Sequence, residues 1–384
     1  MRVCLVYDCL FPYTVGGAER WYRNLGERLA REGHEVTYLT LRQWDRGVVP
    51  DAGPGVRVQV AGPRMALYHE GRRRILPPVA FGVGVFWHLL RRGQRYDVVH
   101  TASFPYFSLL AAGAVRPLRR FRLVVDWHEV WSASYWRDYL GPRGGAIGAL
   151  IQRVCARIPQ HAFCFSRLHA ERLRGEGLRG EVTILRGQFV GGQGAEAPRP
   201  DDGEVLFAGR LIPEKRAPAV VGAVLAAARH LPGLRGVIFG DGPEREEVAR
   251  EIARLHAAGR VRAPGFVGTE ELQEALARAL CLLLPSAREG YGLIVVEAAA
   301  NGVPSVLVAG EDNAATEFIA EGVNGFIAAS AGAEDLAAAI LQIHAAGPAL
   351  REQTLGWFRD HADELSLERS LSTVLARYEA SARA

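Results

Sequence analysis

The sequence predicts an α/β fold with two parallel sheets, on the strength of three observations. Short apolar runs alternate with helical patterns along the whole chain, which is typical of parallel strands joined by crossover helices. The 384 residues exceed one ordinary core, since a domain takes roughly 100–200 residues. Residues 189–204 are rich in Gly, Pro and Asp and show no apolar period. We therefore expect two domains joined by that linker.

The expected strands form two sets. The first set comprises segments near Val3–Asp8, Val36–Thr40, Val56–Val60, Asp97–Thr101, Leu123–His128, Ala162–Ser166 and Val182–Leu185. The second comprises segments near Val205–Gly209, Gly236–Phe239, Val261–Ala263, Cys281–Pro285, Ser305–Val308 and Gly325–Ala328. We accordingly expect an N-terminal domain over residues 1–188 and a C-terminal domain over residues 205–356. Residues 357–384 show helical spacing, and we expect one extra helix there that packs on the N-terminal domain.

The composition excludes several classes of protein. Hydrophobic residues make up 49% and charged residues 23%, as in a globular chain rather than a disordered one. The five cysteines are scattered and never spaced as CxxC, so neither a disulfide framework nor a zinc site is indicated. The longest apolar run, residues 75–90, is too short for a membrane span, and the first residues lack a signal-peptide pattern. These features favour a cytoplasmic protein.

The charged residues are unevenly distributed. Among 46 Lys+Arg the chain has one lysine, Lys215, and therefore 45 arginines. Residues 1–190 hold 28 Arg against 15 acidic residues, a net +13, while the remainder holds 18 basic and 27 acidic residues, a net −9. The two halves should therefore differ in their partners. Nucleic-acid binding is not favoured, because no aromatic module or known fold signature accompanies the arginines.

The segment GRLIPEKR (Gly209–Arg216) directly follows an expected strand, at the end where open α/β sheets bind ligands. It presents Arg210 and Lys215 from one loop. A guanidinium fork grips two oxygens and an ammonium supplies a point charge, so the pair suits a diphosphate. The alternative is an exposed basic loop, but the position of the chain's one lysine favours the functional interpretation.

A second glycine-containing segment, AREGYGLIVVEAAANGVP (Ala287–Pro304), also follows an expected strand. A helix is predicted from about Tyr291 to Asn301-Gly302, with Gly290 and Gly292 at its start, where backbone N–H groups attract anions. Glu289 lies before this helix and Glu297 eight residues later, just over two turns, so both can face the same side, where they would suit two sets of sugar hydroxyls. Alternatively, Glu297 pairs with an arginine.

Two segments of the first half carry further candidates. FPYTVGGAERW (Phe11–Trp21) places Gly16 and Gly17 at a strand-to-helix turn without the GK[ST] of a Walker loop. VVDWHEVW (Val124–Trp131) brings Asp126, His128 and Glu129 to a strand end, although its tryptophans could equally be core residues. In the second half GDGPER, beginning at Gly240, has two of the three dinucleotide-binding glycines, so a dehydrogenase lacks its main support.

Taken together, GGAER, GHEVTYLT, DVVH, the GR…EK loop, GDGPER, EGYGL…VEA, NGVPSV and EGVNGF resemble, in that order, the motifs of retaining glycosyltransferases of family four. The resemblance covers nearly the whole chain. It implies the GT-B fold, in which two Rossmann-like domains face each other across a cleft.

The resemblance also implies roles for matching residues. Arg210 and Lys215 would bind the donor diphosphate, Glu289 the transferred sugar and Glu297 the ribose, while Gly16 and Gly17 would approach the phosphates from the opposite domain. Further donor contacts would come from Gly240, Gly290, Tyr291, Gly292 and Leu293. His128 would contact the sugar near the reacting carbon. Some family members instead carry that histidine in an HxHE-like segment after the DVVH strand, where this chain reads HTASF.

The implied reaction is a metal-independent transfer with retention, without a cofactor, from a nucleoside-diphosphate sugar. The chain has no DxD motif that would hold a divalent ion on the diphosphate. The acceptor would be a glycan, glycolipid or small molecule, in bacterial cell-envelope polysaccharide or glycolipid synthesis. The basic N-terminal domain suggests peripheral contact with an anionic membrane, or alternatively a solvated basic surface. Other possibilities are a sugar-phosphate synthase, a specialised-metabolite glycosyltransferase and a catalytically silent nucleotide-sugar-binding subunit.

Overall fold

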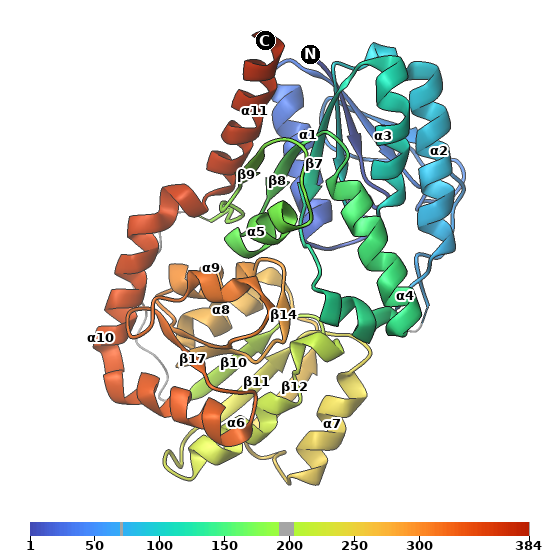
Figure 1. Ribbon diagram of the computed structural model, residues 1–384. Coiled ribbons are helices and arrows are strands. Elements are labelled where there is room, and N and C mark those ends of the chain that lie inside the picture. Colours follow the sequence, from blue (N-terminus) through green and yellow to red (C-terminus); the bar gives the residue numbers. More distant parts are fainter. Residues whose placement is uncertain (70–71, 192–202, 384) are drawn as a thin grey trace. The chain divides into compact units, whose positions relative to one another are not determined.

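The computed structural model of the chain describes residues 1–69, 72–191 and 203–383. The chain divides into two compact units, with residues 1–186 and 368–384 in unit 1 and residues 187–367 in unit 2 (Figure 1). Most of the expected linker, residues 192–202, lies outside the described residues. Each unit is a parallel sheet with helices on both faces, so the predicted α/β class is confirmed.

The sheet of unit 1 has seven parallel strands in the order β3-β2-β1-β6-β7-β8-β9. Their bounds are β1 Arg2–Val6, β2 Glu35–Thr40, β3 Val56–Val60, β6 Val98–Ala102, β7 Arg122–Trp127, β8 His161–Cys164 and β9 Val182–Ile184. β6 and most of β1 and β7 are buried on both faces, which explains their nearly continuous apolar sequences. A two-stranded antiparallel ribbon, β4 Tyr68–His69 and β5 Arg72–Arg73, is added between β3 and α2.

Helices cover both faces of this sheet. Their bounds are α1 Gly17–Arg31, α2 Leu76–Arg92, α3 Phe107–Arg119, α4 Ala133–Ala156, α5 Arg167–Gly175 and α11 Leu367–Arg383, with the 3₁₀ turn η1 Gly93–Arg95 after α2. Helix α4 bends at Gly141, whose φ is 75°, just before Pro142. Helix α11 returns to unit 1 after the chain has built unit 2.

The sheet of unit 2 has six parallel strands in the order β12-β11-β10-β13-β15-β17. Their bounds are β10 Glu204–Ala208, β11 Arg235–Phe239, β12 Val261–Gly265, β13 Cys281–Leu284, β15 Ser305–Val308 and β17 Gly325–Ala328. The helices are α6 Ala219–Ala228, α7 Arg245–Arg254, α8 Thr269–Arg278, α9 Leu293–Ala300 and α10 Ala333–Leu365, with 3₁₀ turns η2 Pro213–Lys215 and η3 Ala314–Phe318. The short strands β14 Arg288–Glu289 and β16 Asp312–Asn313 pair in parallel.

The C-terminal region differs from the expectation of one helix over residues 357–384. Residues 357–365 are the end of α10, a long helix that bends at Gly347, with φ 62°, before Pro348. Helix α10 packs on α6, α9 and β17 and belongs to unit 2. The separate helix α11 packs in unit 1, where Tyr378 is 1% exposed. Helical spacing alone did not show the break, because Ser366 separates two helices that both have apolar periods.

Candidate functional site

The loop that follows β10 presents Arg210 and Lys215 at the carboxyl edge of the unit 2 sheet. Its backbone is tied to the loop after β11, since the N–H of Gly209 donates to the carbonyl of Phe239 (3.1 Å) and the N–H of Leu211 to that of Asp241 (2.9 Å). Gly240 has φ 138°, and a Cβ there would overlap the Gly209 carbonyl oxygen. Glycine at this position therefore allows the two loops to touch.

Lys215 and Glu289 form a short ion pair in this region. The Nζ atom of Lys215 lies 2.5 Å from Oε2 of Glu289, and both side chains are largely buried. The hydroxyl of Ser286 donates to the other carboxylate oxygen, Oε1, at 2.9 Å. The structure thus brings together two predicted site residues that are 74 positions apart, and fixes the carboxylate with Ser286, which the sequence reasoning missed.

The loop around Lys215 is also anchored to the Glu289 segment through its backbone. The N–H of Ala287 donates to the carbonyl of Glu214 at 2.8 Å, and a terminal guanidinium nitrogen of Arg288 lies 3.7 Å from the Glu214 carboxylate. Arg210 differs from these residues: its side chain is exposed, and it makes no ion pair or side-chain hydrogen bond with any residue in the described ranges. The loop therefore offers one cation held in place and another directed to solvent.

Helix α9 begins beside this ion pair, at Leu293. Its N-cap, Gly292, has φ 91°, and a Cβ there would crowd Ala315 of η3. The ring of Tyr291 packs edge-on against Phe318, with the centroids 4.9 Å apart. The first turn of a helix has backbone N–H groups without partners inside the helix, so the predicted anion-attracting helix start is present as a backbone feature. Gly290 leads into it from β14.

Glu289 and Glu297 lie on two different elements at the start of the α9 region. Glu289 lies in β14, four residues before α9 begins, so the two carboxylates come from a strand and a helix. Glu297 itself lies on α9 and is half-buried, and its backbone carbonyl accepts a hydrogen bond from the amide of Asn301 at 2.9 Å. The loop from Gly290 to Gly292 turns the chain between the strand and the helix.

In unit 1 the glycine loop lies between β1 and α1. Gly16 is the N-cap of α1, and a Cβ there would meet the carboxylate of Glu19, while the space around Gly17 is open. The side-chain oxygen of Gln43 accepts hydrogen bonds from the N–H of Leu10 (3.2 Å) and the hydroxyl of Thr14 (3.0 Å). Gln43 thereby holds the loop from the end of β2, and no sequence motif marked it.

The polar groups at the end of β7 separate into two roles. Asp126 is fully buried, and its oxygens lie 2.7 Å from the indole nitrogen of Trp21 and 2.8 Å from Nε2 of His100. Tyr378 of α11 contacts Nδ1 of His100 at 2.5 Å. Burial alone would raise the pKa of Asp126, but His100 and the other partners lower it below the ordinary value. These residues hold the core together rather than face a ligand.

His128 lies just past the end of β7 and faces a different environment. Its ring stacks on Phe165, with centroids 4.5 Å apart and an interplanar angle of 11°. Burial lowers its pKa, although Asp126 and Glu129 act in the opposite direction. Its Nε2 atom is buried without a hydrogen-bond partner among the described residues. One ring nitrogen of His128 is thus left without a hydrogen bond from the described residues.

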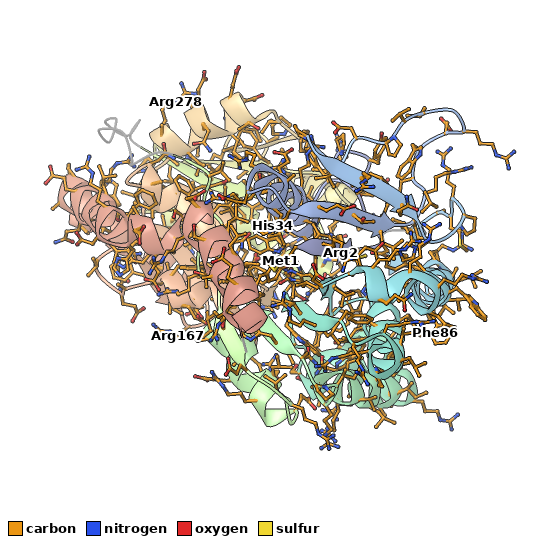
Figure 2. All side chains as sticks on the ribbon, turned by 90° about the horizontal axis from the view of Figure 1, so that it is seen from above. Met1, Arg2, His34, Phe86, Arg167 and Arg278 are labelled. Carbon is orange, nitrogen blue, oxygen red and sulfur yellow. The ribbon has the colours of Figure 1, made fainter. Side chains whose placement is uncertain are left out.

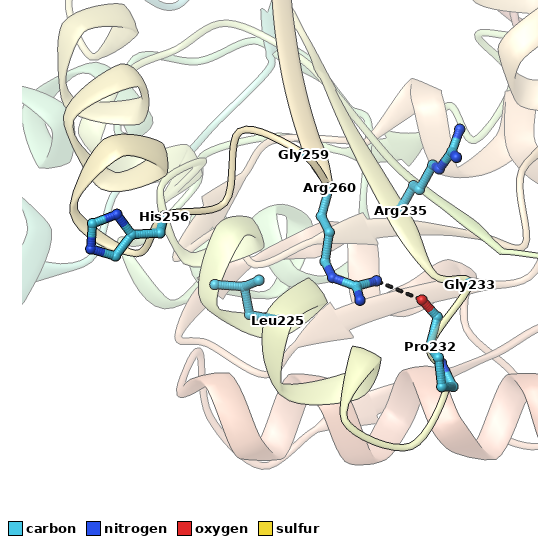
Figure 3. Close-up of a pocket in the computed structure, with 7 residues that line it drawn as sticks. All are labelled: Leu225, Pro232, Gly233, Arg235, His256, Gly259 and Arg260. Atoms are coloured by element: carbon cyan, nitrogen blue, oxygen red, sulfur yellow. Dashed lines mark hydrogen bonds between the residues drawn. The ribbon is translucent and has the colours of Figure 1, made fainter.

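Two hollows in unit 2 differ in their relation to these residues. One, of about 430 Å³, lies at the amino ends of β11 and β12, away from the candidate site. Among its lining residues, the Arg260 guanidinium donates a hydrogen bond to the carbonyl of Pro232 at 2.7 Å (Figure 3). The side chain of His256 points away from Arg235. The other, of about 440 Å³, is lined by Gly240, Arg245 and Gly265 among others, and adjoins the loop that carries Arg210.

In the described part of the chain, no group of three or more His, Cys, Asp or Glu side chains is arranged to hold a metal ion. None of the helices in that part is long and apolar enough to cross a bilayer.

Comparison with known families accounts for both units. Residues 15–186 match the family described as "Glycosyltransferase Family 4", and residues 194–354 match "Glycosyl transferases group 1". The chain is a family-four glycosyltransferase with the GT-B fold. The predicted family, fold and enzyme class are therefore confirmed.

Relatives of this family-four glycosyltransferase include named enzymes. It is 28% identical to a glycogen synthase of Mycobacterium tuberculosis over 369 residues, 89% of this chain and 86% of the relative. It is also 28% identical to a D-inositol 3-phosphate glycosyltransferase of Actinosynnema mirum over 396 residues, 94% of this chain and 92% of the relative.

The fold of the glycosyltransferase matches solved structures along its whole length. Sucrose-phosphate synthase from Thermosynechococcus elongatus has a TM-score of 0.80 at 20% identity, with 98% of both chains covered. The Anabaena protein HepE, in complex with UDP and glucose, has a TM-score of 0.70 at 17% identity, with 99% of both chains covered.

Proposed function

We propose that this glycosyltransferase transfers a sugar, with retention and without a metal, from a nucleoside-diphosphate sugar to an acceptor hydroxyl. The observation that carries the proposal is the Lys215–Glu289 ion pair beside the exposed Arg210. Two cations at the carboxyl end of β10 suit the two phosphates of a leaving diphosphate. HepE, of similar fold, was solved with UDP-glucose, which supports a donor of this class.

The proposed chemistry breaks the bond between the anomeric carbon and the donor phosphate oxygen. The acceptor oxygen forms the new bond on the face that the diphosphate leaves, and the acceptor proton passes to a donor phosphate oxygen. Lys215 and Arg210 stabilise the negative charge that develops on the diphosphate, and the start of α9 adds its partial positive charge. The products are the glycoside and the nucleoside diphosphate, which carries the acceptor proton.

The remaining site residues receive roles on the sugar and the nucleoside. Glu289, which Ser286 orients, accepts hydrogen bonds from hydroxyls of the transferred sugar. Glu297 on α9 accepts hydrogen bonds from the ribose hydroxyls. His128 offers its uncommitted Nε2 to the sugar near the reacting carbon. Gly16 and Gly17 leave the start of α1 accessible to phosphate oxygens, and Gly240, Tyr291 and Leu293 shape the donor site.

For the acceptor we propose a glycan or glycolipid of bacterial cell-envelope synthesis, made in the cytoplasm. The five cysteines are free and buried, in keeping with a reducing compartment. A second candidate is a small phosphorylated acceptor, favoured by the match to a D-inositol 3-phosphate glycosyltransferase over 94% of this chain.

A thermal-shift panel of UDP, GDP, ADP and dTDP tests the donor class, because a ligand that binds the folded state raises its stability. The matching nucleotide sugar is then assayed for slow hydrolysis, with EDTA present, and the configuration of the released sugar is followed by NMR. We expect retained configuration and unchanged turnover in EDTA. An inverted product, or activity that needs an added divalent ion, would refute the mechanism. Binding without any turnover would support a silent subunit.

A further inference from the structure

The outer side of helix α2 in unit 1 is apolar. Leu76, Val83 and Trp87 are spaced by seven and four residues and so lie on one side of the helix. Their exposed fractions are 59%, 54% and 47%. We call these three residues the α2 face. It is bordered by half-buried apolar residues of the same helix, and Figure 2 places one of them, Phe86, at the margin of unit 1.

Close backbone contacts fix which side of α2 points outward. A Cβ on Gly82 would come within 2.6 Å of the Cβ of Phe107 in α3, and one on Gly84 would overlap the carbonyl oxygen of Ala61 after β3. The inner side of α2 therefore lies directly against its neighbours. Rotation of the helix to hide the α2 face would force those contacts apart, so the apolar side remains toward solvent.

Positive charge lies at both ends of the α2 face. Residues 71–96 contain six arginines and no acidic residue. Arg74 precedes the helix and Arg91 and Arg92 end it, and all three are exposed. The guanidinium carbon of Arg91 lies 5.0 Å from the centroid of the Trp87 ring. An indole beside a guanidinium, on an otherwise apolar helix side, suits the boundary between lipid headgroups and acyl chains.

We propose that the α2 face rests in the headgroup region of an anionic lipid bilayer. The three apolar side chains would enter the acyl boundary, and the arginines at both ends of α2 would contact lipid phosphates. A second copy of the chain is a poorer occupant, because a two-fold contact over this face would place arginines of one copy against arginines of the other. An anionic bilayer complements this surface in both respects. Its acyl layer accepts the apolar side chains, and its phosphates carry the charge opposite to that of the arginines.

Cosedimentation with vesicles tests the proposal on the full chain without donor or acceptor, so its outcome is independent of the proposed reaction. We expect binding to vesicles of phosphatidylcholine with phosphatidylglycerol, much weaker binding to phosphatidylcholine alone, and release by salt. Trp87→Ser should lower the partition coefficient roughly tenfold. Arg91→Gln and Arg92→Gln should each lower it roughly fivefold at low salt.

A matched control lies on another helix of the same unit. Ile147 and Leu150 of α4 are each 59% exposed, so Ile147→Ser with Leu150→Ser removes comparable apolar surface elsewhere. This control should bind vesicles as the wild type does. An equal loss in the control, or no binding of the wild type to anionic vesicles, would overturn the proposal.

A second readout does not depend on the polar substitution. Brominated lipids quench tryptophan fluorescence on contact, and Trp87→Phe keeps an aromatic residue at the position. We expect anionic brominated vesicles to quench the tryptophan fluorescence of the wild type. Trp87→Phe should still bind these vesicles, but with a smaller loss of tryptophan fluorescence. Equal quenching of the two proteins would refute insertion of Trp87. A dimer in light scattering that Trp87→Ser dissociates would assign the α2 face to a second copy instead.

Discussion

Lys215 Nζ lies 2.5 Å from Glu289 Oε2, so the one lysine of the chain is held by a carboxylate that is itself 7% exposed. Arg210, on the same loop, makes no such pair within the described residues. In the proposed reaction the donor diphosphate meets one cation that is already neutralised and one that is not.

Lys215→Ala should lower kcat/KM about 100- to 1,000-fold, because it removes a cation that stabilises the leaving diphosphate. Lys215→Arg keeps the charge but replaces a compact ammonium with a planar fork, and we expect it to lose roughly tenfold. Steady-state kinetics on both variants, with circular dichroism to confirm folding, check this. Normal turnover by Lys215→Arg would mean that the lysine has no special role.

Glu289→Gln should bind the nucleoside diphosphate more tightly than the wild type while transferring sugar more slowly. The substitution leaves the Lys215 charge uncompensated in a largely buried site, so a diphosphate gains a stronger partner. Calorimetric titration with the nucleotide measures the affinity. Glu214→Gln is the matched control, since Glu214 is on the same loop but lies near Arg288. Weaker binding by Glu289→Gln would contradict the competition between carboxylate and phosphate.

Glu297→Ala should raise the donor KM roughly tenfold with a smaller effect on kcat, because the proposed contact is to the ribose and not to the reacting carbon. Competition by the free nucleoside diphosphate offers a second measure. Its affinity should also fall, because its ribose loses the same contact. A fall in kcat with the KM unchanged would move Glu297 from ribose binding to the chemical step.

Gly240→Ala should disrupt the site without dismantling unit 2. The added Cβ would overlap the Gly209 carbonyl oxygen, and the φ of 138° adds strain of about 1–3 kcal/mol. The loop with Arg210 must shift, so nucleotide affinity should fall together with the melting temperature. Gly233→Ala is the control, because beyond its two chain neighbours no described atom lies within 4 Å of its added Cβ. Equal effects of the two substitutions would exclude the loop contact as the cause.

Two histidines of unit 1 should make stability depend on pH. Burial lowers the pKa of His88 and of His161 to about 4, helped by the charges of Arg92 and Arg377 respectively. Because the unfolded histidines take up protons from about pH 6.5, the folded state loses stability as the pH falls from that value toward 4. Above pH 6.5 this contribution is constant.

Urea unfolding at a series of pH values checks the prediction. His88→Gln should flatten the pH dependence between pH 6.5 and 4, whereas substitution of the exposed His344 on α10 should not. An unchanged slope in His88→Gln would show that His88 is protonated alike in the folded and unfolded states.

The two sheets and the loop that carries Arg210 and Lys215 could be predicted from the sequence. Contacts between distant segments could not. The strands were recognisable because buried parallel strands are nearly all apolar, as in β13 and β15. Arg210 and Lys215 could be found from their place after such a strand. Ser286 and Gln43 could not, since each acts through a hydrogen bond set by loop geometry. The short strand β14 that carries Glu289 could not be predicted either, because periodicity cannot detect a two-residue strand.

The return of α11 to unit 1 has a consequence for the order in which the protein is made. Tyr378 meets His100 from 278 positions away, and Arg122 donates to the carbonyl of Tyr378 at 2.5 Å. The ribosome releases β6 and β7 long before this partner, so the first unit to begin synthesis is the last to complete its interior. A chain that stops after Leu367 should therefore show early proteolytic cleavage within residues 1–186, while unit 2 keeps the resistance of the full-length protein.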